Sequence, residues 1–96
     1  MLQHNQIVKI VDKVAKANLE SQIVQSVTTE PATDSEGRDA LRITIVIAPG
    51  SASTLSGDAV LNTLYQIQDL LRQQGEERFP IIEYATKDEL EKGGDT

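Results

Sequence analysis

The sequence predicts an α+β fold in which two amphipathic helices pack on one face of a three-stranded sheet. Apolar residues recur with helical spacing in two segments, while β-branched and polar residues alternate in others. Proline, glycine and polar residues separate these segments. The expected order is helix, strand, strand, helix, strand. At 96 residues the chain fits one domain, which we expect to span 1–86, with 87–96 adding one helical turn before fraying.

The first helix is predicted from apolar residues at positions i, i+3, i+4 and i+7 between Ile7 and Val14. This spacing lines one face of a helix. Asn5 is the expected N-cap, because its side-chain oxygen can accept an otherwise unpaired backbone N–H. Asn18 is the expected end of the helix.

A strand is predicted from about Gln22, where the periodicity changes to two and β-branched residues become frequent. Strict alternation places Val24 and Val27 on opposite faces of this strand. Pro31 is expected to end it, because proline cannot donate a hydrogen bond to a neighbouring strand. The polar stretch 32–39 then forms a turn.

The second strand has the clearest alternation in the chain. Odd-numbered residues from Leu41 to Ile47 are apolar and are expected to face the core, whereas Arg42 and Thr44 face the opposite side. Two strands joined by a polar turn most simply form an antiparallel hairpin.

A second helix and a third strand complete the domain. Ser56 is the expected N-cap of this helix, and Gly75 the residue just past its end. Its apolar stripe is the strongest in the chain and comprises Val60, Leu61, Leu64, Ile67 and Leu71. The segment 79–85 reads as a strand, and a helical crossover makes it parallel to the second strand. The pattern leaves open which strand it lies beside.

Few residues are available for chemistry. The chain has no cysteine, and His4, its one histidine, precedes the first helix, so nucleophilic catalysis and nitrogen- or sulfur-ligated metal sites are not expected. The loop 51–57 lacks the lysine of a nucleotide-binding P-loop and is interpreted as a connector. Glu83, an acid–base candidate, is expected to face solvent on its strand. We therefore expect no enzyme activity, no metal and no cofactor.

Charge favours protein partners over nucleic acid. The net charge is −6, of which −5 falls in residues 51–96, and an acidic surface opposes phosphate binding. The exception is a basic stripe at helical spacing on the first helix, which could form an interaction surface with two arginines of the hairpin. The five residues are Lys9, Lys13, Lys16, Arg38 and Arg42.

The second half of the chain contains a recognisable set of features. These are the segment 36–40 leading into the second strand, Arg72 in the long helix, and an Arg–x–Pro stretch running into the last strand. The residues of that stretch and strand are Arg78, Pro80, Ile82 and Tyr84. In these features the chain resembles ribosome-binding factor A and, in element order, the type II KH-like domains. The resemblance implies a ribosome- or RNA-associated role, although the GxxG loop of nucleic-acid-binding KH domains is absent.

Two functional hypotheses follow. The first is a small non-enzymatic interaction module that binds another protein, a basic one by charge complementarity, or a second copy of this chain. The alternative is a ribosome- or RNA-associated KH-like factor. The longest uninterrupted apolar run, 45–48, is far too short to cross a bilayer, and the first residues lack the pattern of a secretory signal. A cytoplasmic protein without membrane association is expected.

Overall fold

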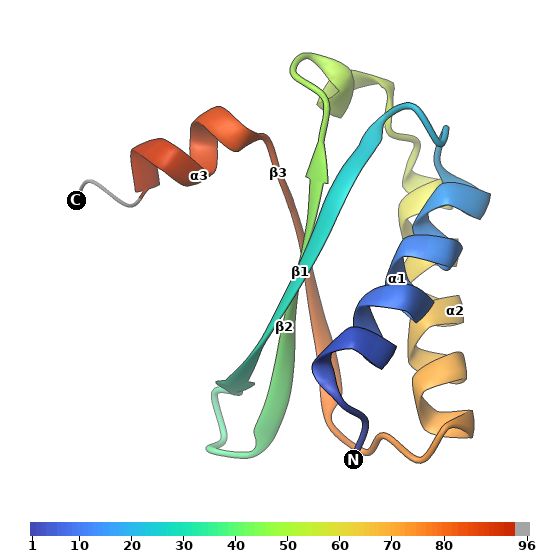
Figure 1. Cartoon of the computed structure of the whole chain (residues 1–96), viewed down its shortest axis with the longest axis vertical. Coiled ribbons are helices and arrows are strands. Elements are labelled where there is room, and N and C mark those ends of the chain that lie inside the picture. The colour runs from blue at the N-terminus through green and yellow to red at the C-terminus, as the bar shows by residue number, and fades with distance from the viewer. Residues whose placement is uncertain (94–96) are drawn as a thin grey trace.

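The computed structural model describes residues 1–93, which form a three-stranded mixed sheet with two long helices on one face (Figure 1). The α+β class and the predicted element order are confirmed. The elements are α1 (His4–Asn18), β1 (Val24–Thr33), β2 (Asp39–Ile47), a 3₁₀ turn (Ser51–Thr54), α2 (Gly57–Gln73), β3 (Phe79–Ala85) and α3 (Lys87–Gly93).

Helix α1 begins one residue earlier than its expected cap. Gln3, not Asn5, occupies the N-cap position, and Asn5 lies inside the first turn. The side chain of Gln6 returns to the start of the helix and accepts the Gln3 backbone N–H at 2.9 Å. This is the reciprocal half of a capping box, which satisfies a donor that the helix itself leaves unpaired. The helix ends at Asn18, as predicted.

Strands β1 and β2 form the predicted antiparallel hairpin, but β1 differs from its prediction in two ways. Pro31 does not end the strand, which continues through Thr33 with Pro31 opposite Leu41. Proline is tolerated here because β1 is an edge strand. Moreover, a bulge between Val24 and Ser26 inserts one extra residue. Val24 and Val27 therefore both contact the core, rather than facing opposite sides.

Strand β2 is central and pairs in parallel with β3, so the sheet order is β1-β2-β3. The parallel pairing was predicted, and the structure supplies the neighbour that the sequence left open. The inward residues of β2 are buried as expected: Leu41, Ile43, Ile45 and Ile47 are each at most 2% exposed. Arg42 alternates with them and therefore lies on the opposite face.

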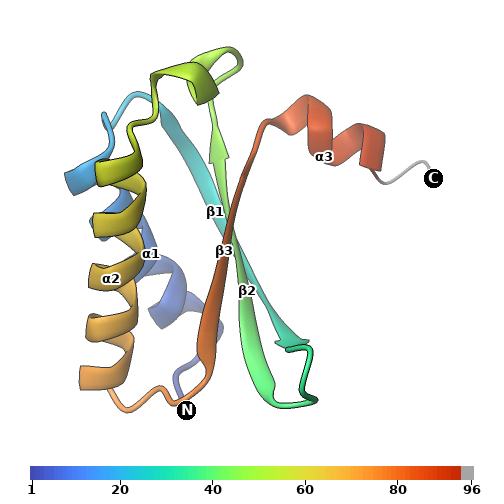
Figure 2. The ribbon, with the colours of Figure 1, turned by 180° about the vertical axis from the view of Figure 1, so that it is seen from behind.

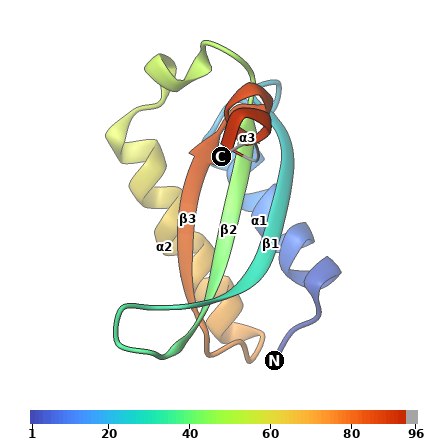
Figure 3. The ribbon, with the colours of Figure 1, turned by 90° about the vertical axis from the view of Figure 1, so that its left-hand side faces the viewer.

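The hydrophobic core lies between the sheet and the two long helices. Figures 2 and 3 show α1 and α2 against the same face of the sheet, and the two helices contact each other, with α1 packed on β1 and α2 on β3. Ile7 and Val11 of α1 and Ile67 and Leu71 of α2 join the inward side chains of β2 in one buried cluster. Ser56 caps α2 as predicted, since its hydroxyl accepts the Ala59 N–H at 3.0 Å.

Helix α3 projects from the end of β3, on the side of the sheet away from α1 and α2 (Figures 1 and 3). Its seven residues exceed the single turn predicted there. Thr86 and Glu89 exchange hydrogen bonds at its start, which is the Thr-x-x-Glu form of the capping box. The predicted fraying of 94–96 lies outside the described residues. None of the helices within 1–93 is long and apolar enough to cross a membrane.

Candidate functional site

The lysines of the predicted basic stripe lie on the solvent-facing side of α1. Lys9, Lys13 and Lys16 are all exposed, opposite the buried face of the helix. Lys16 forms an ion pair with Asp12, with 3.2 Å between Nζ and Oδ2. Lys9 and Lys13 make no ion pair with any residue in 1–93 that the structure describes.

The two arginines do not join this stripe. Arg38 lies in the hairpin turn, where Asp34 and Glu36 bind its guanidinium at 3.1 and 2.7 Å. Arg42 projects from the face of the sheet opposite α1 and forms an ion pair with Glu30 on β1 at 3.5 Å. The five basic residues therefore occupy separate surfaces, and three of them already have acidic neighbours.

The loop 51–57, which was compared above with a nucleotide-binding P-loop, uses its hydroxyl groups in hydrogen bonds to neighbouring backbone groups. The hydroxyls of Ser51, Ser53 and Thr54 donate to backbone carbonyls three residues earlier. Ser56 accepts a backbone N–H as the cap of α2. The side chains of this segment thus stabilise a connector, as the sequence predicts, and none of these hydroxyls points to a ligand.

His4 and Glu83, the remaining titratable candidates, each form a hydrogen bond with one neutral hydroxyl group. His4 Nδ1 lies 2.8 Å from the Thr29 hydroxyl, so α1 and β1 are linked at the start of the helix. Glu83 lies exposed on the face opposite the helices and accepts the Thr44 hydroxyl at 3.0 Å. Within the described part of the chain, no group of three or more His, Asp or Glu residues could hold a metal ion.

The structure shows a site that no sequence motif indicates, an apolar groove of about 260 Å³ between α2 and β3. We call it the β3 groove. Its lining residues are Val60, Leu64, Phe79, Pro80, Ile81, Ile82 and Tyr84. Phe79 and Ile81 lie on the outer face of the sheet, while Ile82 and Tyr84 face the helices. Successive side chains of a strand point to opposite faces of the sheet. A hollow that contacts residues of both faces therefore lies along the edge of β3.

Among the described residues, 1–93, no strand neighbours this edge of β3. The sheet order is β1-β2-β3, so within this range β3 pairs with β2 alone. Figure 3 shows β3 at the border of the sheet, with α2 behind it and no strand beyond it. Such an edge presents backbone N–H and C=O groups that an additional strand can pair with. Pro80 removes a donor only at the second residue of β3.

Large apolar side chains are exposed in the groove and beside its lining residues in sequence. Phe79 and Ile81, which line the groove, are 52% and 37% exposed. Leu61 and Tyr65, which follow the lining residues Val60 and Leu64 in α2, are 49% and 60% exposed. The predicted stripe of α2 is therefore only partly buried. Ile67 and Leu71 enter the core, Leu61 faces solvent, and Val60 and Leu64 are half-buried along the groove. The fully buried position in the first turns of α2 is instead Thr63.

Tyr84 lines the groove, but its phenol oxygen is buried and has no hydrogen-bond partner among the described residues. Thr63 lies beside it, and the Thr63 hydroxyl donates to the Ala59 carbonyl at 2.7 Å. Burial raises the pKa of Tyr84, and the neighbouring Thr63 offsets this in part. A phenol is protonated at neutral pH with or without this shift.

A second, wider hollow of about 630 Å³ with an acidic lining adjoins the groove near the start of β3. The two share Phe79 and Ile81. Asp39 and Glu77 line this second hollow, are exposed, and make no ion pair within residues 1–93. Arg38 also lines it, but its charge is offset by Asp34 and Glu36.

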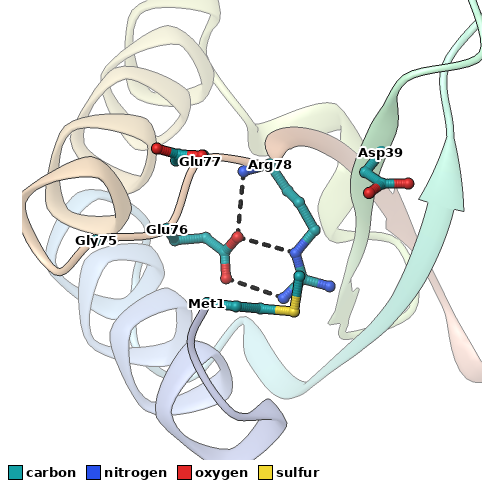
Figure 4. Close-up of a pocket in the computed structure, with 6 residues that line it drawn as sticks. All are labelled: Met1, Asp39, Gly75, Glu76, Glu77 and Arg78. Atoms are coloured by element: carbon teal, nitrogen blue, oxygen red, sulfur yellow. Dashed lines mark hydrogen bonds and ion pairs between the residues drawn. The ribbon is translucent and has the colours of Figure 1, made fainter.

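A buried ion pair holds the start of β3 next to this hollow (Figure 4). Glu76 is only 4% exposed. Its carboxylate accepts Nε and Nη2 of Arg78, each at 2.9 Å, together with the backbone N–H of Arg78 at 3.1 Å and of Leu2 at 2.9 Å. The hydrogen bond from Leu2 ties the N-terminus to the α2–β3 connection. We call this arrangement the Glu76–Arg78 latch.

The latch fixes the charge state of both residues. Hydrogen bonds from the Arg78 side chain, and then from the two backbone N–H groups, lower the pKa of Glu76 from 4.5 to about 2. A carboxylate with so low a pKa is a poor proton acceptor near neutral pH. Its role here is to position the first residues of β3.

No protein-family model matches this chain, and comparisons with curated proteins and with solved structures likewise find no match.

Proposed function

We propose that this protein is a small non-enzymatic interaction module that binds another protein in the β3 groove. The observation that carries the proposal is the combination of an unpaired strand edge with an apolar groove beside it. Addition of a strand to a sheet edge is a common mode of peptide recognition, in which the backbone supplies affinity and pockets for alternate side chains supply specificity.

Exposure of large apolar side chains supports the same surface. Contiguous exposed apolar residues on a small protein are typical of interaction sites. Leu61, Tyr65 and Phe79 are each about half exposed, and aromatic residues are enriched among those that dominate binding energy.

The proposal is tested by comparing captured proteins between two matched variants. Phe79→Thr removes an apolar side chain from the groove, whereas Leu90→Thr removes one of similar exposure, 46%, from α3. We expect wild type and Leu90→Thr to retain the same partner from an extract of the cells that make the protein, and Phe79→Thr to lose it. Equal retention by Phe79→Thr, or no specific capture by wild type, would contradict the proposal. Circular dichroism melting shows whether the variants are folded.

The RNA-associated alternative is supported by one observation, the exposed pair Lys9 and Lys13 on α1. Replacement of both by Glu would abolish salt-sensitive RNA binding if this alternative held. The KH-like resemblance and the cytoplasmic location stay predictions.

A further inference from the structure

The geometry of the β3 groove defines the backbone conformation of its occupant. The groove follows a strand edge, so a segment that pairs with β3 must itself be extended. Side chains of such a segment alternate every residue between the two faces of the enlarged sheet. One set would then contact Phe79 and Ile81, and the other would lie near Ile82 and Tyr84.

The length of β3 limits the length of the segment. β3 comprises seven residues, from Phe79 to Ala85. Paired strands have matching rises of roughly 3.3 Å per residue, so a segment of about five to seven residues fills the edge. The side chains that line the groove are apolar, apart from Tyr84, whose hydroxyl is buried, so the occupant needs apolar side chains.

The charges near the groove indicate which residue of the occupant should flank its apolar side chains. Glu77, two residues before β3, and Asp39, the first residue of β2, line the acidic hollow that adjoins the groove. The cations near them are already engaged, Arg78 by Glu76 and Arg38 by Asp34 and Glu36. Neither carboxylate makes an ion pair among the described residues. Asp39 lies near enough to Arg78 to help raise the pKa of that guanidinium, but Arg78 is bound by Glu76, so the two acids still favour a lysine or arginine on the ligand.

The same charges disfavour a second copy of this chain as the occupant. Each copy carries a net charge of −6, with −5 in residues 51–96, which include α2 and β3. Pairing two β3 edges would bring like-charged halves together, and like charges in an interface oppose association.

We infer that the β3 groove takes an extended segment of a partner protein, with apolar side chains at alternate positions and a lysine or arginine placed against Asp39 and Glu77. The inference rests on the proposed function and adds to it the chemistry of the partner. It differs from a purely hydrophobic docking site in requiring the positive charge.

A library of random heptapeptides displayed on phage tests this inference, with the full chain as bait. Four baits are compared: wild type, Phe79→Thr, the double variant D39N/E77Q, and the double variant D58N/D69N. The last makes the same change in net charge at two exposed acids of α2 that line none of the hollows described above. We expect wild type and D58N/D69N to enrich peptides with alternating apolar residues and a terminal lysine or arginine.

The variants separate the two levels of the proposal. We expect D39N/E77Q to lose the basic preference but to keep the apolar alternation, and to bind the wild-type consensus peptide about fivefold more weakly. Enrichment of apolar peptides without a basic residue, or a basic preference that D39N/E77Q retains, would overturn the inference and leave the proposed function standing. No enrichment on wild type, or equal enrichment on Phe79→Thr, would overturn the proposed function itself. A dimer detected by light scattering at micromolar concentration that Phe79→Thr abolishes would make the second copy the occupant and also overturn the inference.

Discussion

The two edge strands of the sheet differ in regularity, polarity and neighbours. β1 has ten residues, a bulge near its start and Pro31 within it, and its outward side chains are mostly threonine, serine and glutamate. β3 pairs without any register shift over its seven residues and carries Phe79, Ile81 and Ile82 along the groove, with Pro80 near its start and Glu83 as its one charged residue. Bulges, prolines and charges are the devices by which proteins protect sheet edges from unwanted pairing. The bulge makes β1 the better protected edge, which favours β3 as the proposed docking edge.

Both edge strands pair with the central strand β2, whose inward side chains face the helices. Ile45 of β2 is fully buried and lies opposite a residue of β1 on one side and a residue of β3 on the other. Ile45→Asp should unfold the domain, because an unpaired buried charge costs several kcal/mol against a total stability of about 5–8 kcal/mol. Urea denaturation measures this change.

Arg42→Ala is the matched control on the neighbouring residue of the same strand. Its ion pair with Glu30 is exposed, so we expect a loss below about 0.5 kcal/mol. Similar losses for the two variants would show that the inward face of β2 has been misassigned.

A second prediction concerns the Glu76–Arg78 latch, which holds β3 but has no counterpart at β1. Glu76→Gln leaves the largely buried Arg78 without its counterion and should cost about 3 kcal/mol. Glu77→Gln, at the exposed neighbour, should change stability by less than about 0.5 kcal/mol. Equal stability of wild type and Glu76→Gln in urea would show that the latch does not hold β3.

The latch also predicts a dependence of stability on pH. Because folding lowers the pKa of Glu76 from 4.5 to about 2, its contribution of about 3 kcal/mol is complete above pH 4.5 and is lost as the pH falls toward 2. Urea denaturation at pH 6, 4 and 2.5 should show a steeper loss in wild type than in Glu76→Gln. Parallel curves for the two proteins would contradict the assigned pKa.

Apart from the control variants, the smallest predicted effect on stability comes from the bulge in β1. Deletion of Gln25 removes the extra residue between Val24 and Ser26 and leaves a regular alternation, so we expect a change of about 1 kcal/mol or less. The straightened edge should, however, increase self-association in light scattering. Gln25→Ala keeps the bulge and should leave self-association as in wild type. Self-association that is unchanged after the deletion would show that the bulge does not protect β1.

Much of the fold could be predicted from local sequence patterns. Alternation in β2, the bounds of β3, the cap at Ser56 and the parallel crossover all follow from local patterns. The wrong predictions concern the N-cap of α1, the end of β1 and the direction of Val24, where the tertiary context or an unrecognised cap decides the structure. Pro31 is tolerated only because β1 lies at an edge, and the bulge that turns Val24 inward has no distinct residue pattern.

The site could not be predicted, because it depends on which residues become neighbours. Leu61 and Ile67 look alike on a helical stripe, but only Ile67 reaches the core. The groove exists because β3 lies at an edge, and the sequence left the strand order open. Glu76 reads as one of two adjacent surface acids, and only its neighbours Leu2 and Arg78 make it buried. The Thr86-x-x-Glu89 box was a readable signal for α3 that periodicity alone overlooks.

Amide NMR of the intact protein with an added peptide tests the central claim, that β3 and not β1 is the docking edge. The probe is an acetylated, amidated heptapeptide, Lys-Lys-Val-Thr-Val-Thr-Val, titrated to millimolar concentration. We predict chemical-shift changes over Phe79–Ala85 and around Val60 and Leu64 on α2, with Val24–Thr33 unchanged. Shifts concentrated on β1 or on the lysines of α1, or no shifts in β3, would contradict this account.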